Sequence, residues 1–115
     1  MAQVRKMLGQ ARPANTTVVS IYSPTEGITA NVSHIVICNT TGTAATFRIF
    51  HSDGGTTYDQ TTALYYDKNV NGAETLRIYP LGETGFAMNN PDGNLAVRTG
   101  TASALTFTVY GTETQ

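Results

Sequence analysis

Residues 105–110 read Leu-Thr-Phe-Thr-Val-Tyr, an unbroken alternation of apolar and polar side chains. Because successive side chains of a β-strand point to opposite faces, this segment predicts a strand with one buried and one exposed face. Comparable segments recur about 8 to 12 residues apart, separated by turns rich in Gly, Pro, Asn and Asp. The sequence therefore predicts an all-β fold of about eight short strands, an antiparallel β-sandwich of jelly-roll type. The expected strands are residues 16–22, 28–38, 44–51, 63–66, 74–79, 85–88, 95–98 and 105–110.

Residues 28–51 contain two of these strands, joined by a turn at residues 39–43, and they predict a β-hairpin. The first strand alternates until His34 and is then continuously apolar as far as Cys38. Either a β-bulge re-aims the strand at this point, or its second half is covered on both faces. The expected core residues are Val18, Ile21, Val32, Val36, Phe47, Ile49, Leu76, Ile78, Phe86, Leu95, Val97, Leu105, Phe107 and Val109.

The composition indicates one small domain that is poor in charge. A chain of 115 residues can hold one modest core, and no internal repeat is visible. Charged residues make up 13%, about half the usual share, and the net charge of −1 gives no reason to expect binding to nucleic acid. Residues 1–10 lack the apolar run of a signal peptide, and no segment is long enough to span a membrane. From these two features we expect synthesis in a cytoplasm. The single cysteine, Cys38, excludes an internal disulfide.

The beginning of the chain differs from the rest, because residues 1–12 carry three basic side chains and no acidic one. Gly9 and Pro13 would interrupt a long helix there. We therefore expect an arm, one β-domain and a short polar tail. The predicted boundaries are residues 1–15 for the extended N-terminal arm, 16–111 for the β-sandwich domain and 112–115 for the C-terminal tail.

The basic arm, and the many tyrosines in a chain without Trp, favour contacts with other proteins over chemistry. Arm cations can pair with acidic patches while apolar residues fill a groove, and a Tyr ring supplies contact area at low entropic cost. Each exposed ion pair adds less than about 1 kcal/mol, so apolar burial must supply most of the affinity. Outward tyrosines could instead form a platform for sugars. The predicted partner-binding residues are Val4, Arg5, Lys6, Met7, Leu8, Arg12, Tyr58 and Tyr65.

Catalytic and metal-binding patterns are weak. His34 and His51 lack the spacing of a zinc site, and catalytic zinc needs three protein ligands. Asp53 and Asp59 share a loop with oxygen ligands for calcium, but the spacing is not that of an EF-hand and Asp-Gly is first a turn signal. No serine lies in a Gly-x-Ser-x-Gly elbow. We expect no enzymatic activity, no metal and no cofactor.

Several short segments follow one another in a characteristic order over nearly the whole chain. They are Leu8-Gly9-Gln10, Tyr22-Ser23-Pro24 and residues 32–39, 44–49, 64–67 and 105–111. In this order the chain resembles small virion structural proteins of tailed bacteriophages, some of them head decoration (cement) proteins and others associated with tails.

The resemblance implies a capsid decoration protein that forms a homotrimer and binds the major capsid protein, or another virion protein, through its arm and strand faces. It implies residence in the virion, most specifically on the capsid surface, without binding to nucleic acid or membrane. Two alternatives remain open. One is a tail or baseplate component, and the other is a carbohydrate-binding module that recognises a receptor.

Overall fold

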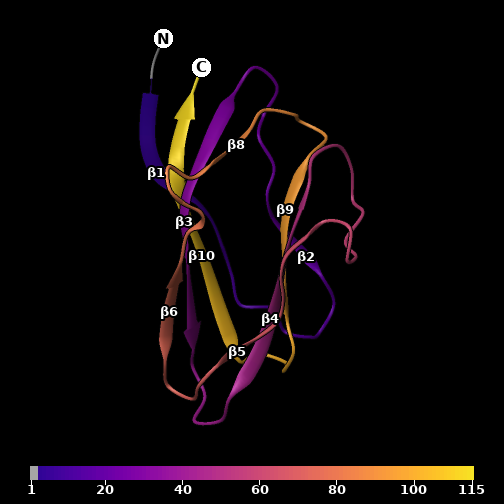
Figure 1. Cartoon of the computed structure of the whole chain (residues 1–115), viewed down its shortest axis with the longest axis vertical. Coiled ribbons are helices and arrows are strands. Elements are labelled where there is room, and N and C mark those ends of the chain that lie inside the picture. The colour runs from indigo at the N-terminus through magenta and orange to yellow at the C-terminus, as the bar shows by residue number, and fades with distance from the viewer. Residues whose placement is uncertain (1–2) are drawn as a thin grey trace.

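Two antiparallel sheets packed face to face form the body of the molecule (Figure 1). The computed structural model describes residues 3–115, with the backbone alone for Leu81 and Glu83, and these residues form ten strands. The first sheet has the order β1 (Gln3–Ala11), β10 (Leu105–Thr114), β3 (Thr29–Asn39) and β6 (Thr75–Ile78), and β8 (Phe86–Met88) also pairs with β3. The second sheet has the order β2 (Val19–Tyr22), β9 (Asn94–Thr99), β4 (Ala45–Ser52) and β5 (Ala63–Val70). The short strand β7 (Pro80–Glu83) lies between β6 and β8 in the chain.

The strands pair in a nested order that defines the fold. β4 pairs with β5, β3 with β6 and β8, β2 with β9, and β1 with β10, so that each pair encloses the previous one in the sequence. Successive pairs alternate between the two sheets, as in a long antiparallel ribbon rolled into a sandwich. This is the jelly-roll arrangement. The predicted all-β sandwich of jelly-roll type is therefore confirmed.

The core lies between the sheets and follows the alternation seen in the sequence. Leu105, Phe107 and Val109 of β10 are all fully buried. Burying one such side chain contributes about 1.5–3 kcal/mol. Phe107 meets Phe47 of the opposite sheet edge to face, with ring centroids 6.2 Å apart, so the two sheets interlock at this point. Most predicted core residues are buried: Val32, Phe47, Ile49, Ile78, Phe86, Leu95, Val97, Leu105, Phe107 and Val109.

A β-bulge in β3 reverses which side chains point inward. Tyr110 of β10 pairs with His34, but the next residue pairs with Val32, so Ser33 is an extra residue. A bulge was one of the two alternatives for the change of pattern at His34, and it is confirmed. After the bulge, Ile35 is fully buried, whereas Val36, which was expected in the core, lies on the outer side and is half-buried.

The predicted hairpin over residues 28–51 is wrong, because β3 and β4 belong to different sheets. Asn39, at the end of β3, has a buried side chain that binds the turn after it. Its amide nitrogen donates to the carbonyl oxygens of Thr43 (2.9 Å) and Val70 (3.2 Å), and its oxygen accepts from the backbone N–H of Thr41 (2.9 Å). These bonds hold the turn across the end of the sandwich, so the chain crosses to the second sheet.

The predicted N-terminal arm and C-terminal tail are also corrected. Residues 3–11 form β1, which pairs with β10 along its whole length, and β10 continues to Thr114. Gly9 fits tightly against β2, where a Cβ atom would lie 2.2 Å from the carbonyl oxygen of Ile21. The segment is therefore an edge strand of the jelly roll. The first two residues of the predicted arm lie outside the described residues.

Candidate binding face

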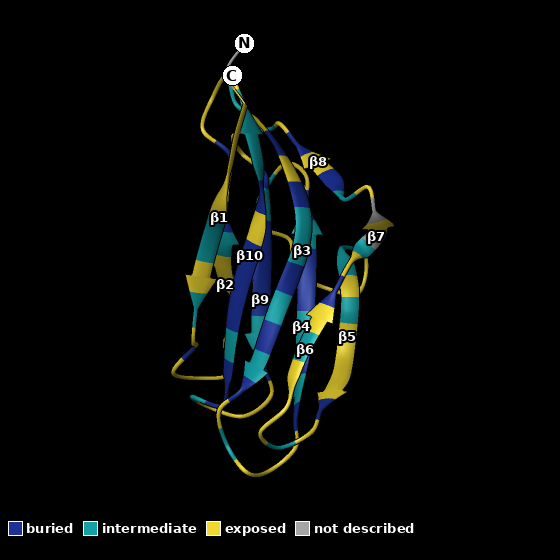
Figure 2. Cartoon of the chain, turned by 90° about the vertical axis from the view of Figure 1, so that its left-hand side faces the viewer, coloured by how far each residue is buried: buried dark blue, intermediate teal, exposed yellow. Residues whose placement is uncertain are grey.

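The strands β1, β10, β3 and β6 lie side by side on one side of the molecule (Figure 2). We call the surface formed by their side chains that point away from the core the outer face. The pairing register aligns these side chains in rows that run across the strands. Its members from the four strands and the residue after β6 are Gln3, Arg5, Met7, Gln10, Thr29, Asn31, His34, Val36, Cys38, Thr75, Arg77, Tyr79, Thr106, Thr108, Tyr110, Thr112 and Thr114.

One row of the outer face, which we call the aromatic row, consists of four large side chains, three of which are substantially exposed. Its members are Met7, Tyr110, His34 and Tyr79. Met7 pairs with Tyr110, and Tyr110 pairs with His34. The rings of His34 and Tyr110 stack with centroids 5.1 Å apart, and His34 also lies 5.5 Å from the ring of Tyr79. Met7, Tyr110 and Tyr79 are 47%, 38% and 42% exposed. Contiguous exposed apolar groups, unlike scattered ones, mark contact surfaces.

The imidazole in the middle of the aromatic row is uncharged at neutral pH. Partial burial lowers the pKa of His34 below its usual value of 6.5, and the positive charge of Arg77 lowers it further. The imidazole Nδ1 lies 3.1 Å from the hydroxyl oxygen of Ser33, which orients the ring. The centre of the row therefore presents a neutral aromatic surface at physiological pH.

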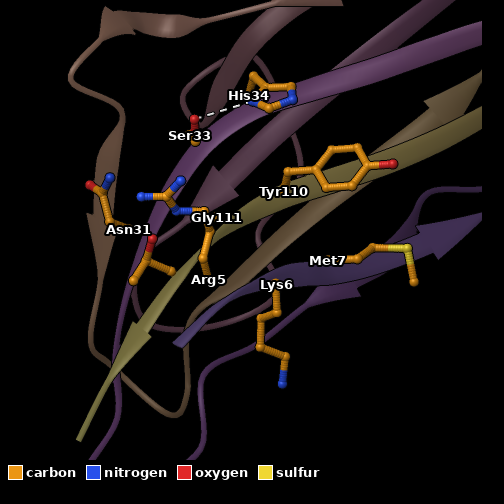
Figure 3. A pocket seen from close by; sticks show the side chains of 9 residues that line it. Arg5, Lys6, Met7, Asn31, Ser33, His34, Tyr110 and Gly111 are labelled. Carbon is orange, nitrogen blue, oxygen red and sulfur yellow. Dashed lines mark hydrogen bonds between the residues drawn. The ribbon is translucent and has the colours of Figure 1, made fainter. Parts of the chain in front are cut away.

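A depression with a volume of about 620 Å³ lies beside the aromatic row (Figure 3). Arg5 pairs with Thr112 and Thr112 pairs with Asn31, so these side chains form the next row of the outer face. Tyr110 borders the depression on the side of the aromatic row. In Figure 3, Arg5 points toward Asn31, whereas Lys6 points the opposite way. The depression thus combines a guanidinium group, polar side chains and an aromatic wall.

Two β-bulges on either side of β10 shape this part of the outer face. Leu8 is the extra residue in β1 and Ser33 is the extra residue in β3, and both bulges adjoin Tyr110. The next residue of β10 is Gly111, where a Cβ atom would lie 2.2 Å from the carbonyl oxygen of Asn31. Glycine is therefore needed for the close approach of the two strands. Bulges re-aim side chains, and here they do so on both neighbours of one residue.

The outer face is basic, although the whole chain has a net charge of −1. Its side chains include Arg5 and Arg77 but no Asp or Glu within the described part of the chain. Glu113 of β10 points to the other side of the sheet. There its carboxylate accepts from the Lys6 ammonium at 3.1 Å and from the Tyr22 hydroxyl at 2.6 Å, which joins the two sheets. A surface of this charge complements an acidic partner.

Strand alternation divides the predicted partner-binding residues of β1. Arg5 and Met7 lie on the outer face. Val4 and Lys6 point the other way, and Leu8 packs against the core. The arm hypothesis treated these five residues as one docking patch, which the structure does not form.

The other three predicted partner-binding residues lie elsewhere. Arg12 follows the end of β1 and donates to the carbonyl oxygen of Ser103 at 3.4 Å. Tyr58 lies in the loop before β5, and its ring packs 6.1 Å from that of Phe50. Tyr65 is half-buried, with its ring 5.9 Å from that of Phe47 in the core.

Four outer-face residues that line the depression are absent from the predicted partner-binding residues: Asn31, His34, Tyr110 and Thr112. Tyr110 and Thr112 belong to the closing strand, whose alternation already indicated that Tyr110 faces away from Leu105. However, only the strand order places β1 and β3 on either side of β10.

The outer side of the second sheet differs, because Arg48 there is paired with a carboxylate and lies over an aromatic ring. Arg48 donates two hydrogen bonds to Asp67, at 2.7 and 3.1 Å, and its guanidinium carbon lies 3.9 Å from the centre of the Tyr66 ring. The same hydrogen bonds lower the pKa of Asp67. Phe50 is 1% exposed, with the rings of Tyr58 and Tyr66 nearby. On this side the arginine Arg48 is therefore already paired, although Leu64 and Tyr66 are 39% and 43% exposed.

No metal centre is formed by the described residues, because no three His, Cys, Asp or Glu side chains converge. His34 and His51 lie on different sheets. Asp59 accepts a hydrogen bond from the backbone N–H of Thr61 at 2.8 Å, so it stabilises a turn. Cys38 is a free, half-buried thiol. Over residues 3–115, no helix has the length and apolar character required to cross a bilayer.

Comparisons with known proteins find likeness in structure and none in sequence. No protein-family model matches the chain, and no curated protein matches its sequence. A chain in the structure of infectious bursal disease virus, Gt strain, is similar at 8% sequence identity with a TM-score of 0.41. The similarity covers 97% of this chain, which spans 28% of the length of the viral chain.

Proposed function

We propose that this chain is a non-enzymatic structural protein of a bacteriophage virion, most specifically a decoration (cement) protein on the capsid surface. It binds the coat-protein lattice through the outer face. The observation that carries the proposal is the aromatic row, in which Met7, Tyr110 and Tyr79 leave large side chains in contact with water around His34.

The composition of the outer face supports a protein partner. Aromatic residues, Met and Arg are enriched at protein interfaces, whereas Asp, Glu and Lys are depleted at their centres. The outer face has this character, since its remaining residues are mainly Thr and its two arginines are accompanied by no carboxylate. The virion setting rests on the resemblance of the sequence to small phage virion proteins. The jelly roll is also a fold of viral capsid domains, though it serves many other functions.

Attachment of this kind stabilises a capsid by mass action. A protein that binds the assembled lattice, but not dispersed coat subunits, shifts the equilibrium toward the lattice in proportion to its own concentration and affinity. A homotrimer presents three outer faces, so that the first contact raises the effective concentration for the others. A modest affinity for each face is therefore sufficient for firm attachment.

A second candidate function is carbohydrate binding by a receptor-recognition module, which the depression beside Tyr110 favours. An aromatic ring can stack on a sugar, while Asn31 and Thr112 offer hydrogen bonds to its hydroxyl groups. A position in the tail or baseplate would use the same outer face on a different virion protein. Cryo-electron microscopy of the particle distinguishes tail from head.

The test uses purified particles that lack the chain, together with the recombinant full chain. We expect Tyr110→Ala to weaken binding to particles by roughly 30-fold or more, as for a residue at the centre of an interface. Leu64→Ala is the matched control, because Leu64 is a similarly exposed apolar residue (39%) on the other sheet. The proposal is wrong if native particles lack the chain, or if Tyr110→Ala binds them as well as the wild type does.

A further inference from the structure

We propose that the depression beside Arg5 receives an Asp or Glu side chain of the docked coat protein, and that Arg5 is the contact that selects this partner. The inference rests on the proposed function, because it names the chemistry of the partner at the same face.

Arg5 has a positive charge that the described residues leave uncompensated. Lys6 is paired with Glu113 at 3.1 Å, and Arg48 with Asp67 at 2.7 Å. The guanidinium of Arg5, like that of Arg77 on the same face, makes no hydrogen bond or ion pair with another described side chain. Nor does a carboxylate of any described side chain line the depression.

Docking changes the energetics of this charge. In the free protein Arg5 is exposed, and water satisfies its N–H groups at little cost. A partner that covers the adjacent aromatic row would remove much of that water. An arginine stripped of water is strongly destabilising unless an acceptor replaces the water. Docking on the aromatic row therefore requires an acceptor at Arg5, and a carboxylate matches both the charge and the planar fork of the guanidinium.

The neighbours of Arg5 suit a carboxylate. The hydroxyl of Thr112, its register partner on β10, is available as a second donor. Asn31 is held in place because its amide nitrogen donates to the carbonyl oxygen of Thr84 at 3.2 Å. Tyr110 forms an apolar wall that excludes water from one side of an incoming ion pair. Exclusion of water strengthens such a pair.

The extent of the aromatic row favours a polypeptide over an acidic sugar as the source of the carboxylate. The row crosses four strands, from Met7 on β1 to Tyr79 after β6, which corresponds to about 14 Å at the usual strand spacing. A single acidic sugar could fill the depression but would leave most of the row exposed. A protein surface covers the depression and the row together.

Two experiments test the carboxylate contact. In the first, we expect Arg5→Gln to weaken binding to particles by roughly 30-fold or more. The matched control Lys68→Gln removes an exposed cation from the second sheet and should change binding by less than about fivefold.

In the second experiment, the Arg5→Lys variant is treated with a carbodiimide on the particle. The reagent joins the lysine amine to a carboxylate as an amide, and the water lost converts the carbodiimide to a urea. Mass spectrometry should then find residue 5 linked to an Asp or Glu of the coat protein.

The outcomes separate this inference from the proposed function. If Tyr110→Ala weakens binding and Arg5→Gln does not, the carboxylate contact is overturned and the docking face stands. If neither variant weakens binding to particles, the outer face is not the docking face and both proposals fail. If the chain does not bind particles but binds sialylated or uronate-containing glycans, and Arg5→Gln abolishes this binding, the depression is a site for acidic sugars. The proposed contact with the coat protein is then refuted.

Discussion

Replacing Gly9 by Ala is expected to destabilise the protein, because the backbone of β1 at Gly9 lies close against the backbone of β2 at Ile21. The new Cβ would lie 2.2 Å from the carbonyl oxygen of Ile21, although real Cβ atoms essentially never come within 3.0 Å of a neighbour. The obstacle is backbone, so relief requires one strand to shift. Forcing a methyl group into a packed contact costs about 1–3 kcal/mol. The smaller entropy of an unfolded chain with Ala offsets about 0.4–1 kcal/mol of this.

The net loss of up to about 2.6 kcal/mol should appear in urea unfolding followed by circular dichroism, with an unchanged m-value, and as a fall in Tm of up to about 10 °C. Gly42→Ala is the control, because a Cβ at Gly42 meets nothing within 4 Å and the residue has no positive φ. This control should be neutral or slightly stabilising. If the two variants have the same midpoint, β1 does not pack against β2, and the N-terminal segment is the free arm that its composition first suggested.

Three further changes test other parts of the structure. Asn39→Ala removes a buried amide that makes four hydrogen bonds at the end of β3, so we expect a loss of about 2–4 kcal/mol in urea unfolding. Tyr22→Phe removes the hydroxyl that donates to Glu113, for a loss of about 1–2 kcal/mol. Because that bond lowers the pKa of Glu113, its stabilisation is present above about pH 4.5 and is lost as the pH falls through the folded pKa, so the two proteins should converge in acid. His51 has a buried Nε2 without a hydrogen-bond partner, and burial lowers the pKa of the imidazole below 6.5. Below pH 6.5 the unfolded chain therefore protonates this imidazole before the folded protein does, and the free energy of unfolding falls. His51→Phe should therefore lose less stability than the wild type between about pH 7 and pH 5, and an equal loss would leave His34 as the sole histidine responsible.

The strands that could be predicted are those whose pairing leaves the local alternation intact. Leu105, Phe107 and Val109 alternate without interruption, and all three are buried. In β3, one inserted residue at Ser33 shifts the phase, so a count by twos from Val32 assigns the wrong side to Val36 and overlooks its buried neighbours. A bulge is one of the two alternatives that the sequence offers there, but its effect on which side chains point inward depends on which residue is extra. That choice is made by the partner strand, not by the local sequence.

The N-terminal strand could not be predicted from its own residues. It is an edge strand with most side chains exposed, and a bulge at Leu8 breaks its alternation. Its partner β10 begins at Leu105, far away in the sequence, so the information that makes it a strand is not local. Its basic residues, in the absence of a clear strand pattern, therefore favour the interpretation as a flexible arm. The same strand contributes Arg5 and Met7 to the outer face. The sequence predicts these two residues as parts of a flexible arm, whereas in the structure they belong to the exposed side of a strand.

The candidate site likewise depends on strand pairing that the local sequence does not reveal. Met7, His34, Tyr79 and Tyr110 are widely separated in sequence, and only the order β1-β10-β3-β6 places them in one row. No spacing rule within a single sequence relates such residues, because the nested pairing of a jelly roll brings the two ends of the chain together. Tyr58 and Tyr65 were chosen for their type alone, and both pack against other rings of their own chain.

The contrast between the two outer surfaces is the strongest argument that one of them is covered in the assembled state. On the second sheet, Arg48 is paired with a carboxylate and lies over an aromatic ring, and Phe50 is 1% exposed, although Leu64 and Tyr66 are 39% and 43% exposed. On the first sheet, Arg5 has no such partner among the described residues, and exposed rings flank a neutral imidazole. Folding does not require this arrangement, because Thr in place of Met7 and Tyr110 would fill a strand equally well and would remove the exposed apolar surface. The features that the fold leaves unsatisfied are an aromatic strip and a cation without a counter-ion, and these are what a partner with an apolar patch and a carboxylate would satisfy together.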